Sequence, residues 1–395
     1  MGTDVIVVGA GVAGLAAARA LVGAGRSVVV LEARERIGGR TWTDDAIGVP
    51  VDLGASWIHG VDGNPLWALA GSFGIDTVEY TVGSFQPDGR PIAYHAPDGH
   101  RLPDDGRRAF LDDIALVDER LLDVVADAAD TTSYRQAVDT VLAGLDWTAR
   151  RRQRVREYTD HRAEDLCGAP STDLAAHGLD DEHVAGDEVV FPGGYGQYAE
   201  HLAAGLDVRT GAVVVEVEQN DERVRITTQD GDVYGAAHAI VTVPLGVLRA
   251  GDVRFVPPPP EVVAGARDRL GMGVYDKVFL RFAERFWGDD WVHRQQGEAG
   301  TDWHSWYDMS RATGEPVIAA LLGGAGARRI ERRTDDEIVA EALAALSRMF
   351  GEVPDPEAVR ITRWAADPFA RGSYSYVHVG GSPDDHDRLG EPFGR

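Results

Sequence analysis

The sequence predicts an α/β protein of two interleaved domains, and three observations carry that prediction. The chain has 395 residues, which is long enough for a large core and for more than one domain. Its opening joins β-branched runs through a glycine turn and a helical pattern, which indicates a Rossmann-like nucleotide-binding unit. Residues 109–129 and 135–157 then show helical spacing with many Asp and Arg side chains, which indicates the helical part of a second domain.

Charge is the unusual feature of the composition. The chain has 39 Lys and Arg against 64 Asp and Glu, a net charge of −25. This balance argues against a nucleic-acid partner, because neutralising phosphates needs a basic face. A negative field of this kind attracts small cations such as protonated amines. The simpler interpretation is that the acidity only keeps the protein dissolved.

The cysteine content and the apolar runs limit the class of protein further. The single cysteine, Cys167, excludes an intramolecular disulfide and any multi-cysteine metal site, and no metal centre is predicted. The first apolar run, Val5 to Val8, has the pattern of a strand, so no signal peptide is expected. No apolar window approaches the roughly 20 residues that a membrane span needs. A cytoplasmic protein without a membrane partner is therefore expected.

The opening of the chain follows the order strand, glycine turn, helix, strand and acid. Residues 4–8 and 27–31 are the two strands, residues 15–22 are the helix, and Glu32 follows the second strand. The carboxylate of Glu32 can accept hydrogen bonds from both hydroxyls of a ribose, which a 2′-phosphate would block. This order predicts a dinucleotide site.

Each glycine of the first turn has a physical task. Gly9 permits the tight turn, Gly11 lets the backbone approach a pyrophosphate without an intervening Cβ, and Gly14 lets the helix pack closely on the strand. The helix N-terminus presents unpaired N–H groups and a positive dipole end to the phosphates. A lone pattern of this kind is often only a tight turn, but the strand before it and the acid after it favour nucleotide binding.

A second glycine turn follows the acid. Gly38, Gly39 and Arg40 can bring a guanidinium back onto the pyrophosphate, which it would pair in bidentate fashion. Simple NAD dehydrogenases do not carry this element, so it favours FAD over NAD. The alternative is a turn that carries a surface arginine.

From residue 52 the pattern becomes specific. The segment Asp52-Leu53-Gly54-Ala55-Ser56-Trp57-Ile58-His59-Gly60, followed by Gly63-Asn64-Pro65-Leu66, resembles the flavin amine oxidases, and within them the polyamine oxidases and the flavin-dependent histone lysine demethylases. Further matches occur in order at residues 191–196, 208–217, 239–248, 255–260, 275–280, 286–287 and 363–376. The resemblance covers nearly the whole chain and is weakest at residues 101–187.

The resemblance implies FAD as the cofactor and a particular division of the chain. A Rossmann-like FAD-binding domain of the GR2 flavoprotein type would be interleaved with an α+β substrate-binding domain of mixed sheet plus helices. The implied parts are a first FAD-binding part at 1–80, a largely helical substrate part at 81–187, a second FAD-binding part at 188–256, sheet and helices of the substrate domain at 257–362, and a truncated return toward the FAD domain at 363–395.

The resemblance also implies a reaction and the residues that assist it. A hydride equivalent would pass from the carbon beside an unprotonated amine to flavin N5, the imine would be hydrolysed, and O2 would reoxidise the flavin with release of H2O2. Lys277 matches the family lysine that holds a water at N5, and Tyr275, on the same face of its strand, matches an aromatic residue of the amine channel. His59 matches a polar residue at the substrate side, where it could bind or deprotonate the amine.

Each of these residues also has a purely structural explanation. Lys277 could be a surface strand lysine, and His59 a structural histidine that ties down its loop. Trp364 matches a tryptophan near the flavin ring, although core packing explains a Trp there almost as well. The positions expected to contact FAD are Gly9, Gly11, Gly14, Glu32, Ala33, Arg34, Gly39, Arg40, Gly54, Ala55, Ser56, Trp57, Val214 and Trp364.

The sequence departs from the family pattern after residues 390–392. Family members continue there into a strand and a Gly-Glu-Ala-Thr type motif, whereas this sequence ends at Arg395. We therefore expect the C-terminal FAD-binding segment to be missing through truncation, supplied by another chain or homo-oligomer partner, or lost in a degenerate flavoprotein. An isolated chain of this kind would expose a strand edge and hold FAD weakly.

Three functions stay open at this stage. The leading one is oxidation of a polyamine or related amine, with the amine and O2 as small-molecule partners. The second keeps the fold but oxidises carbon–carbon bonds, and the third is an inactive or partner-dependent flavoprotein. Which amine is used, and on which side of a secondary amine the bond is cleaved, cannot be inferred from these residues.

Overall fold

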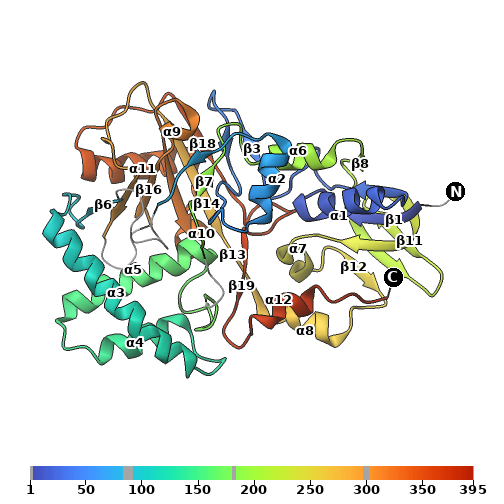
Figure 1. Ribbon diagram of the computed structural model, residues 1–395, viewed down its shortest axis with the longest axis horizontal. Helices are drawn as coiled ribbons and strands as arrows, with labels where there is room; N and C mark the ends of the chain where they lie inside the picture. Colours follow the sequence, from blue (N-terminus) through green and yellow to red (C-terminus); the bar gives the residue numbers. More distant parts are fainter. Residues whose placement is uncertain (1–2, 83–91, 180–183, 297–301, 395) are drawn as a thin grey trace.

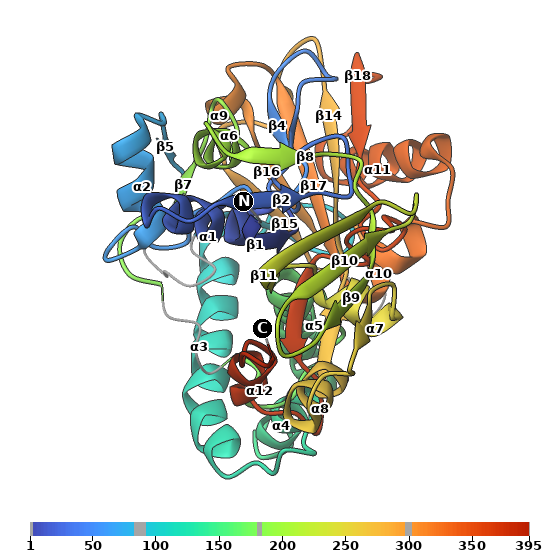
Figure 2. The same cartoon turned by 90° about the vertical axis from the view of Figure 1, so that its right-hand side faces the viewer.

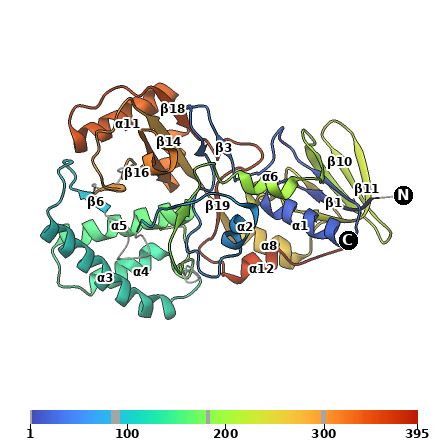
Figure 3. The same cartoon turned by 45° about the horizontal axis from the view of Figure 1, so that its top comes forward.

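Two lobes, each built on its own sheet, lie side by side (Figure 1). The computed structural model describes residues 3–82, 92–179, 184–296 and 302–394. Between the lobes runs the antiparallel pair of β13 (Leu270–Gly273) and β19 (Tyr374–Val377). Both ends of the chain lie at the lobe of the larger sheet, as Figures 2 and 3 show.

The larger sheet has seven strands and a parallel centre. In spatial order they are β12 (Arg254–Val256), β9 (Val214–Gln219), β10 (Val224–Thr228), β11 (Val233–Val241), β1 (Thr3–Val8), β2 (Val28–Leu31) and β8 (Asp207–Arg209). Side chains of β1 alternate between two cores: Val5 and Val7 pack under α1 and α6, whereas Ile6 and Val8 face the core of β9 and β10. The central strand is thus buried on both faces, as parallel sheets require.

The smaller sheet has six strands and carries the other half of the molecule. In spatial order they are β18 (Ala358–Ile361), β14 (Tyr275–Arg281), β17 (Val317–Gly323), β16 (Ser305–Asp308), β15 (Val292–Gln295) and β6 (Ile92–His95). Val278 and Leu280 of β14 pack into one core, and Tyr275 and Phe279 into the other. Because side chains alternate along a strand, Lys277 lies on the face of Tyr275, as predicted from the spacing.

Helices cover both sheets, and two short ladders connect the loops. The helices are α1 (Val12–Gly23), α2 (Pro65–Phe73), α3 (Asp104–Ala126), α4 (Tyr134–Ala143), α5 (Ala149–Cys167), α6 (Gln197–Ala203), α7 (Leu245–Ala250), α8 (Glu261–Arg269), α9 (Ser310–Thr313), α10 (Gly324–Ile330), α11 (Asp335–Phe350) and α12 (Asp384–Leu389). The ladders pair β3 (Thr43–Asp44) with β4 (Val51–Asp52) and β5 (Val78–Glu79) with β7 (Val189–Val190). The predicted class, α/β with mixed sheet plus helices, is confirmed.

The helical prediction for the second lobe was wrong in one respect. The helix expected at 135–157 is two helices, α4 and α5, separated by residues 144–148. Ser133 and Gln136 form a capping box that starts α4, and the Thr148 hydroxyl accepts the N–H of Arg151 to start α5. Helical spacing continued across the break because both helices face the same core. Within the described ranges, no helix is long and apolar enough to cross a membrane.

Candidate active site

Two cavities meet between the lobes. The larger has a volume of about 620 Å3 and includes the carboxyl ends of β1 and β2, and the smaller has about 440 Å3 and lies against the six-stranded sheet. Five residues line both cavities: Gly54, Ala55, Tyr275, Lys277 and Tyr374. Ligands of open α/β sheets bind at the carboxyl ends of the strands, so the larger cavity is the expected nucleotide site.

The first glycine turn has the geometry that close approach of a pyrophosphate needs. Gly9 has a φ of +107°, and a Cβ on Gly14 would lie 2.0 Å from the carbonyl oxygen of Gly9. A Cβ on Gly11 would meet nothing within 4 Å, because this residue faces the cavity. Gly14 is thus required by helix–strand packing, and Gly11 leaves the N-terminus of α1 uncovered.

Glu32 fixes the glycine turn through hydrogen bonds from its carboxylate to backbone N–H groups. Its Oε2 accepts the N–H of Ala10 at 2.7 Å, and its Oε1 accepts the N–H of Arg34 at 3.0 Å. The side chain is buried at the end of β2 and lines the cavity. A carboxylate oxygen has more than one acceptor site, so each keeps capacity for a ribose hydroxyl.

The two predicted arginines differ in how their charge is balanced. Arg34 pairs with Asp367 at 2.5 Å between Nη2 and Oδ1. Arg40 donates from Nη1 to the carbonyl oxygen of Ser373 at 2.7 Å, and among the described residues no carboxylate lies within 4.0 Å of its guanidinium. Desolvation by the surrounding protein lowers the pKa of Arg40, although the side chain is open to the cavity. A guanidinium at a cavity wall without a carboxylate partner fits an anionic pyrophosphate.

The loop from Leu53 to Trp57 divides the two cavities. A Cβ on Gly54 would lie 1.8 Å from the carbonyl oxygen of Arg40, so only glycine fits this crossing. Trp364 fixes the same loop by donating from its indole Nε1 to the carbonyl oxygen of Leu53 at 2.9 Å. The backbone therefore reaches the cavity surface at Gly54 and Ala55 without a large side chain in between.

Lys277 lies under this loop at the junction of the cavities. It is only 5% exposed, and its Nζ donates to the carbonyl oxygens of Asp52 at 3.0 Å and Gly54 at 2.6 Å and to the Ser56 hydroxyl. Burial lowers the pKa of Lys277 to about 8, although the nearby Asp52 carboxylate opposes that shift. It is also the only lysine of the sequence, since every other residue among the 39 Lys and Arg is an arginine.

Aromatic side chains form the walls beside Lys277. The Trp57 ring centroid lies 5.8 Å from the Lys277 Nζ, and it packs against Tyr307 at 5.6 Å. Tyr275 and Tyr374 meet edge to face at 5.7 Å where the cavities join. Burial holds the pKa of Tyr275 well above its usual value, so its hydroxyl stays protonated. Such walls suit an alkylammonium group.

His59 lies at the exposed side of the smaller cavity. Its side chain is 52% exposed, whereas its partner Glu188 is 1% exposed, and 2.5 Å separates His59 Nδ1 from Glu188 Oε1. Glu188 is itself anchored, because its Oε2 accepts the N–H of Val82 at 3.0 Å. The ring of His59 stacks on Trp57 at 6.3 Å. A buried carboxylate thus orients the imidazole.

The fold brings together most of the residues predicted for the site. The larger cavity alone is lined by Gly9, Gly11, Glu32, Ala33, Arg34, Gly39, Arg40, Val214 and Trp364. Ser56, Trp57 and His59 line only the smaller cavity. Gly14 lines neither, because it packs on Gly9.

Sequence reasoning missed several lining residues. In the larger cavity these are Gln229, Thr242, Pro244, Asp252 and Phe369, and in the smaller cavity Asp165, Glu188, Arg294, Tyr307 and Tyr374. Thr242 and Pro244 lie in the matched segment 239–248, and Phe369 and Tyr374 in 363–376, but neither match assigned them a role, and Asp165 lies in the region of weakest resemblance. The uniqueness of Lys277 in the composition was a usable signal for the site.

Comparison with known proteins gives the same picture. The sequence model of the family described as flavin containing amine oxidoreductase matches residues 12–395. Polyamine oxidase 4 of Oryza sativa subsp. japonica is 33% identical over 98% of this chain and 81% of its own length, and polyamine oxidase 2 of Arabidopsis thaliana is 32% identical over the same shares. Lysine-specific histone demethylase 1 homolog 1 of Oryza sativa subsp. japonica is 32% identical over 98% of this chain and 48% of its own length.

A solved structure is similar over nearly the whole chain. Putrescine oxidase in its wild-type form bound to putrescine has a TM-score of 0.77 and 25% identity, covering 96% of this chain and 89% of that one. In the present chain, the glycine turn, Glu32 and Arg40 fit FAD in the larger cavity, and FAD is its cofactor. The chain belongs to the family of flavin-containing amine oxidoreductases.

Proposed function

We propose that this chain oxidises a polyamine, or a related primary or secondary amine, to an imine that is hydrolysed to an aldehyde and an amine. The observation that carries the proposal is the buried Lys277, the only lysine of the chain, at the junction of the two cavities. FAD, when bound in the larger cavity, would accept a hydride equivalent from the carbon beside the amine nitrogen and pass its electrons to O2, giving H2O2.

The FAD contacts proposed here are those that the sequence suggested. The uncovered N-terminus of α1 and the unbalanced charge of Arg40 would hold the pyrophosphate, and Glu32 would accept the ribose hydroxyls. Gly54, Ala55 and Trp364 would face the flavin end, because they lie where the larger cavity reaches Lys277. The FAD-binding part would comprise residues 1–80, 188–256 and 363–395, and the substrate part residues 81–187 and 257–362.

The smaller cavity would bind the amine. Its aromatic walls, Trp57, Tyr275 and Tyr307, can stabilise a cation and exclude water from the reacting carbon. The net charge of −25 would raise the local concentration of a polycation at the entrance. Polyamines therefore suit this cavity better than neutral or anionic substrates.

Lys277 would handle the proton of the hydrolytic water. An arginine in its place would stay charged, whereas an amine with a pKa of about 8 can change its protonation state near neutral pH. Its hydrogen bonds to Asp52, Gly54 and Ser56 fix the Nζ atom against the loop that divides the cavities. A water bound to that nitrogen would lose a proton to it while adding to the imine carbon.

His59 would accept the proton of the incoming ammonium. With Glu188 ionised, Nδ1 carries the hydrogen that points at the carboxylate, which leaves the lone pair on Nε2. The half-exposed ring lies beside Trp57, where a substrate nitrogen would enter. An unprotonated amine is needed because an ammonium has no lone pair to stabilise the developing imine.

An absorption experiment tests the proposal. The purified chain, supplied with FAD under anaerobic conditions, is mixed in turn with spermidine, spermine, putrescine and a simple monoamine. We expect the flavin bands to bleach with at least one polyamine and to return in air with release of peroxide. Bands that stay unchanged with every amine, in a chain that holds FAD, would contradict the proposed reaction.

A further inference from the structure

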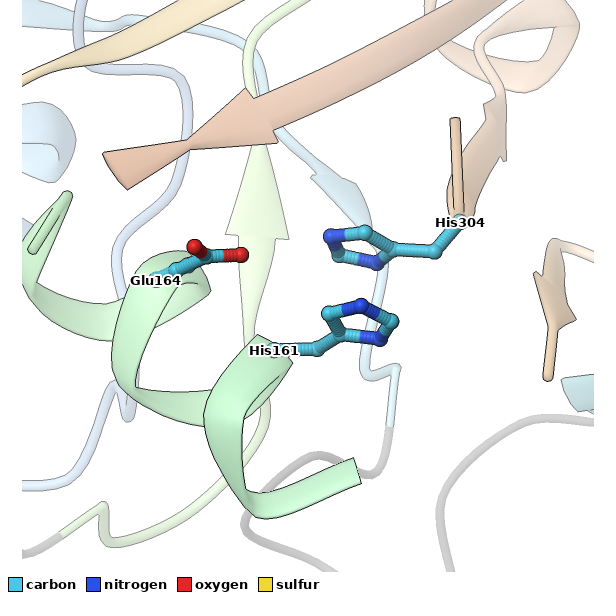
Figure 4. A group of neighbouring side chains, drawn as sticks. All are labelled: His161, Glu164 and His304. Atoms are coloured by element: carbon cyan, nitrogen blue, oxygen red, sulfur yellow. The ribbon is translucent and has the colours of Figure 1, made fainter. Parts of the chain in front are cut away.

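Outside the two cavities, a cluster of three possible metal ligands lies in the substrate lobe (Figure 4). His161 and Glu164 lie one turn apart on the same face of α5, and His304 comes from the residue before β16. One ligand atom from each side chain lies within 4.8 Å of the other two. The three residues therefore join a helix to the sheet that it covers.

We propose that His161, Glu164 and His304 form a binding site for a divalent transition-metal ion of the Zn2+ class. Two imidazoles and one carboxylate are a donor set that such ions prefer. The proposal does not depend on amine oxidation, because none of the three residues lines the amine cavity.

The charges around the cluster are of both signs, since Arg294 acts on both histidines while several carboxyl groups surround Glu164. Three other carboxylates lie near Glu164, and each has its own arginine: Asp165 with Arg294, Asp160 with Arg135, and Asp302 with Arg329. In the described part of the chain, no arginine, lysine or histidine lies within 4.0 Å of the Glu164 carboxylate. Glu164 is thus the one carboxyl group of the four that has no cationic side chain beside it, although it accepts the backbone N–H of Ala325, and a bound cation would provide the missing partner.

The two imidazoles lie beside the Glu164 carboxyl group. His304 has its Nδ1 at 2.8 Å from the Ser305 hydroxyl, which fixes the ring and leaves Nε2 on the side of Glu164. The ring of His161 lies parallel to that of His304, and its side chain is one helical turn from Glu164. Neutral imidazoles and an ionised carboxylate are the forms that bind a metal ion, so binding displaces any proton that these groups hold.

A cavity of about 20 Å3 adjoins both histidines on a side lined by Arg154 and Arg294 and not by Glu164. This volume is enough for one water molecule, so the ion itself would lie between the histidines and Glu164. The rings are stacked 3.6 Å apart at 4°, so one imidazole must turn out of the stack to aim its nitrogen at the ion. Ligand atoms around Zn2+ lie roughly 3.3 Å apart at bond lengths of about 2.0–2.1 Å, a closure that side-chain torsions can supply.

Metal binding to tag-free, metal-stripped chain tests the proposal. The probe is Zn2+ in equilibrium dialysis with elemental analysis, at saturating FAD. We expect one Zn2+ per chain in the wild type, and at least tenfold weaker binding in His161→Ala, Glu164→Gln and His304→Ala. His100→Ala, an exposed histidine beside Asp98 and far in sequence from the cluster, is the matched control and should bind as the wild type does.

The outcomes are distinct. Absence of stoichiometric Zn2+ in the wild type, or binding that all three variants retain, would overturn the site. Because an alanine variant can misfold, Co2+ added to the wild type gives an independent readout: visible d–d bands typical of nitrogen and oxygen ligands support the site, and their absence overturns it. Glu164→Gln keeps the side-chain shape and is the variant least prone to unfold.

Discussion

Replacing Lys277 by methionine should change the pH dependence of stability in a defined direction. Lys277 has a pKa of about 8 in the folded chain, against 10.5 for an exposed lysine. Below pH 8 the buried ammonium therefore costs about 3 kcal/mol of folding free energy relative to a neutral side chain, at about 1.4 kcal/mol per pKa unit. Methionine has a similar length and no charge, so Lys277→Met removes this cost at every pH.

The sign follows from proton binding. Between pH 8 and 10.5 the unfolded wild type holds more protons than the folded wild type, so its free energy of unfolding rises with pH. The variant lacks this group and shows no such rise from it. Asp52, whose pKa burial raises to about 6, is already ionised in this range. Groups that do not interact with Lys277 titrate equally in both proteins and cancel in the comparison, whereas the pKa of Asp52 rises in the variant because the lysine charge that lowers it is removed.

The assay is urea unfolding of both proteins at pH 7.5 and 9.5 with saturating FAD. We expect the stability of the wild type relative to Lys277→Met to increase by about 2 kcal/mol between these two pH values. The hydrogen bonds lost with the lysine shift both comparisons equally and do not affect this difference. Because Lys277 is the only lysine, lysine labelled with 15N at Nζ gives one resonance whose titration reports the pKa directly. A pH-independent difference, or a midpoint near 10.5, would refute the reasoning.

Three further changes test other parts of the site. Arg40→Met removes a guanidinium without a carboxylate partner at the cavity wall, so it should lower the ratio of flavin to protein absorbance after gel filtration at least tenfold. The far-ultraviolet circular dichroism should stay unchanged. Arg254→Met, at an exposed strand position, is the control. Gly54→Ala should lower the free energy of unfolding in urea by about 1–3 kcal/mol, since the added Cβ would lie 1.8 Å from a backbone oxygen. The control is Gly71→Ala in helix α2, where an added Cβ meets nothing within 4 Å, and it should be neutral or stabilising. His59→Gln should lower kcat/KM for the best amine about 100-fold or more, and Glu188→Gln should lower it less because the ring remains; equal activity of His59→Gln and wild type would exclude a role in deprotonation.

Local patterns were enough to predict the nucleotide-binding half of the site. Gly9, Gly11, Gly14 and Glu32 lie within one strand–helix–strand unit, so their sequence spacing already fixes their spatial relation. The same holds for Tyr275 and Lys277, which share a strand face.

Long-range pairs could not be found in this way. Glu188 contacts His59 although the two are 129 residues apart in the sequence. Arg294 of β15 forms an ion pair with Asp165 of α5. No periodicity connects such positions, because only the packing of the second lobe brings them together. The break between α4 and α5 was missed for a related reason. Both helices keep apolar residues toward one core, and the capping residue Thr148 is the local sign that a new helix begins.

The lysine at position 277 can be explained by comparing its surroundings with those of the arginines in the rest of the chain. Everywhere else this sequence uses arginine as its cation, including in buried pairs such as Arg294 with Asp165. Arginine suits those places because its charge is permanent and its planar group pairs well with carboxylates. At position 277 the hydrogen-bond partners are two backbone carbonyls and a hydroxyl, none of them anionic, and the surroundings combine aromatic rings with the nearby carboxylate of Asp52, which does not hydrogen-bond to Nζ. A permanent charge would be costly there, whereas an amine with a pKa of about 8 can release its proton near neutral pH. The single exception to an all-arginine composition thus falls where the proposed reaction would use a titratable nitrogen.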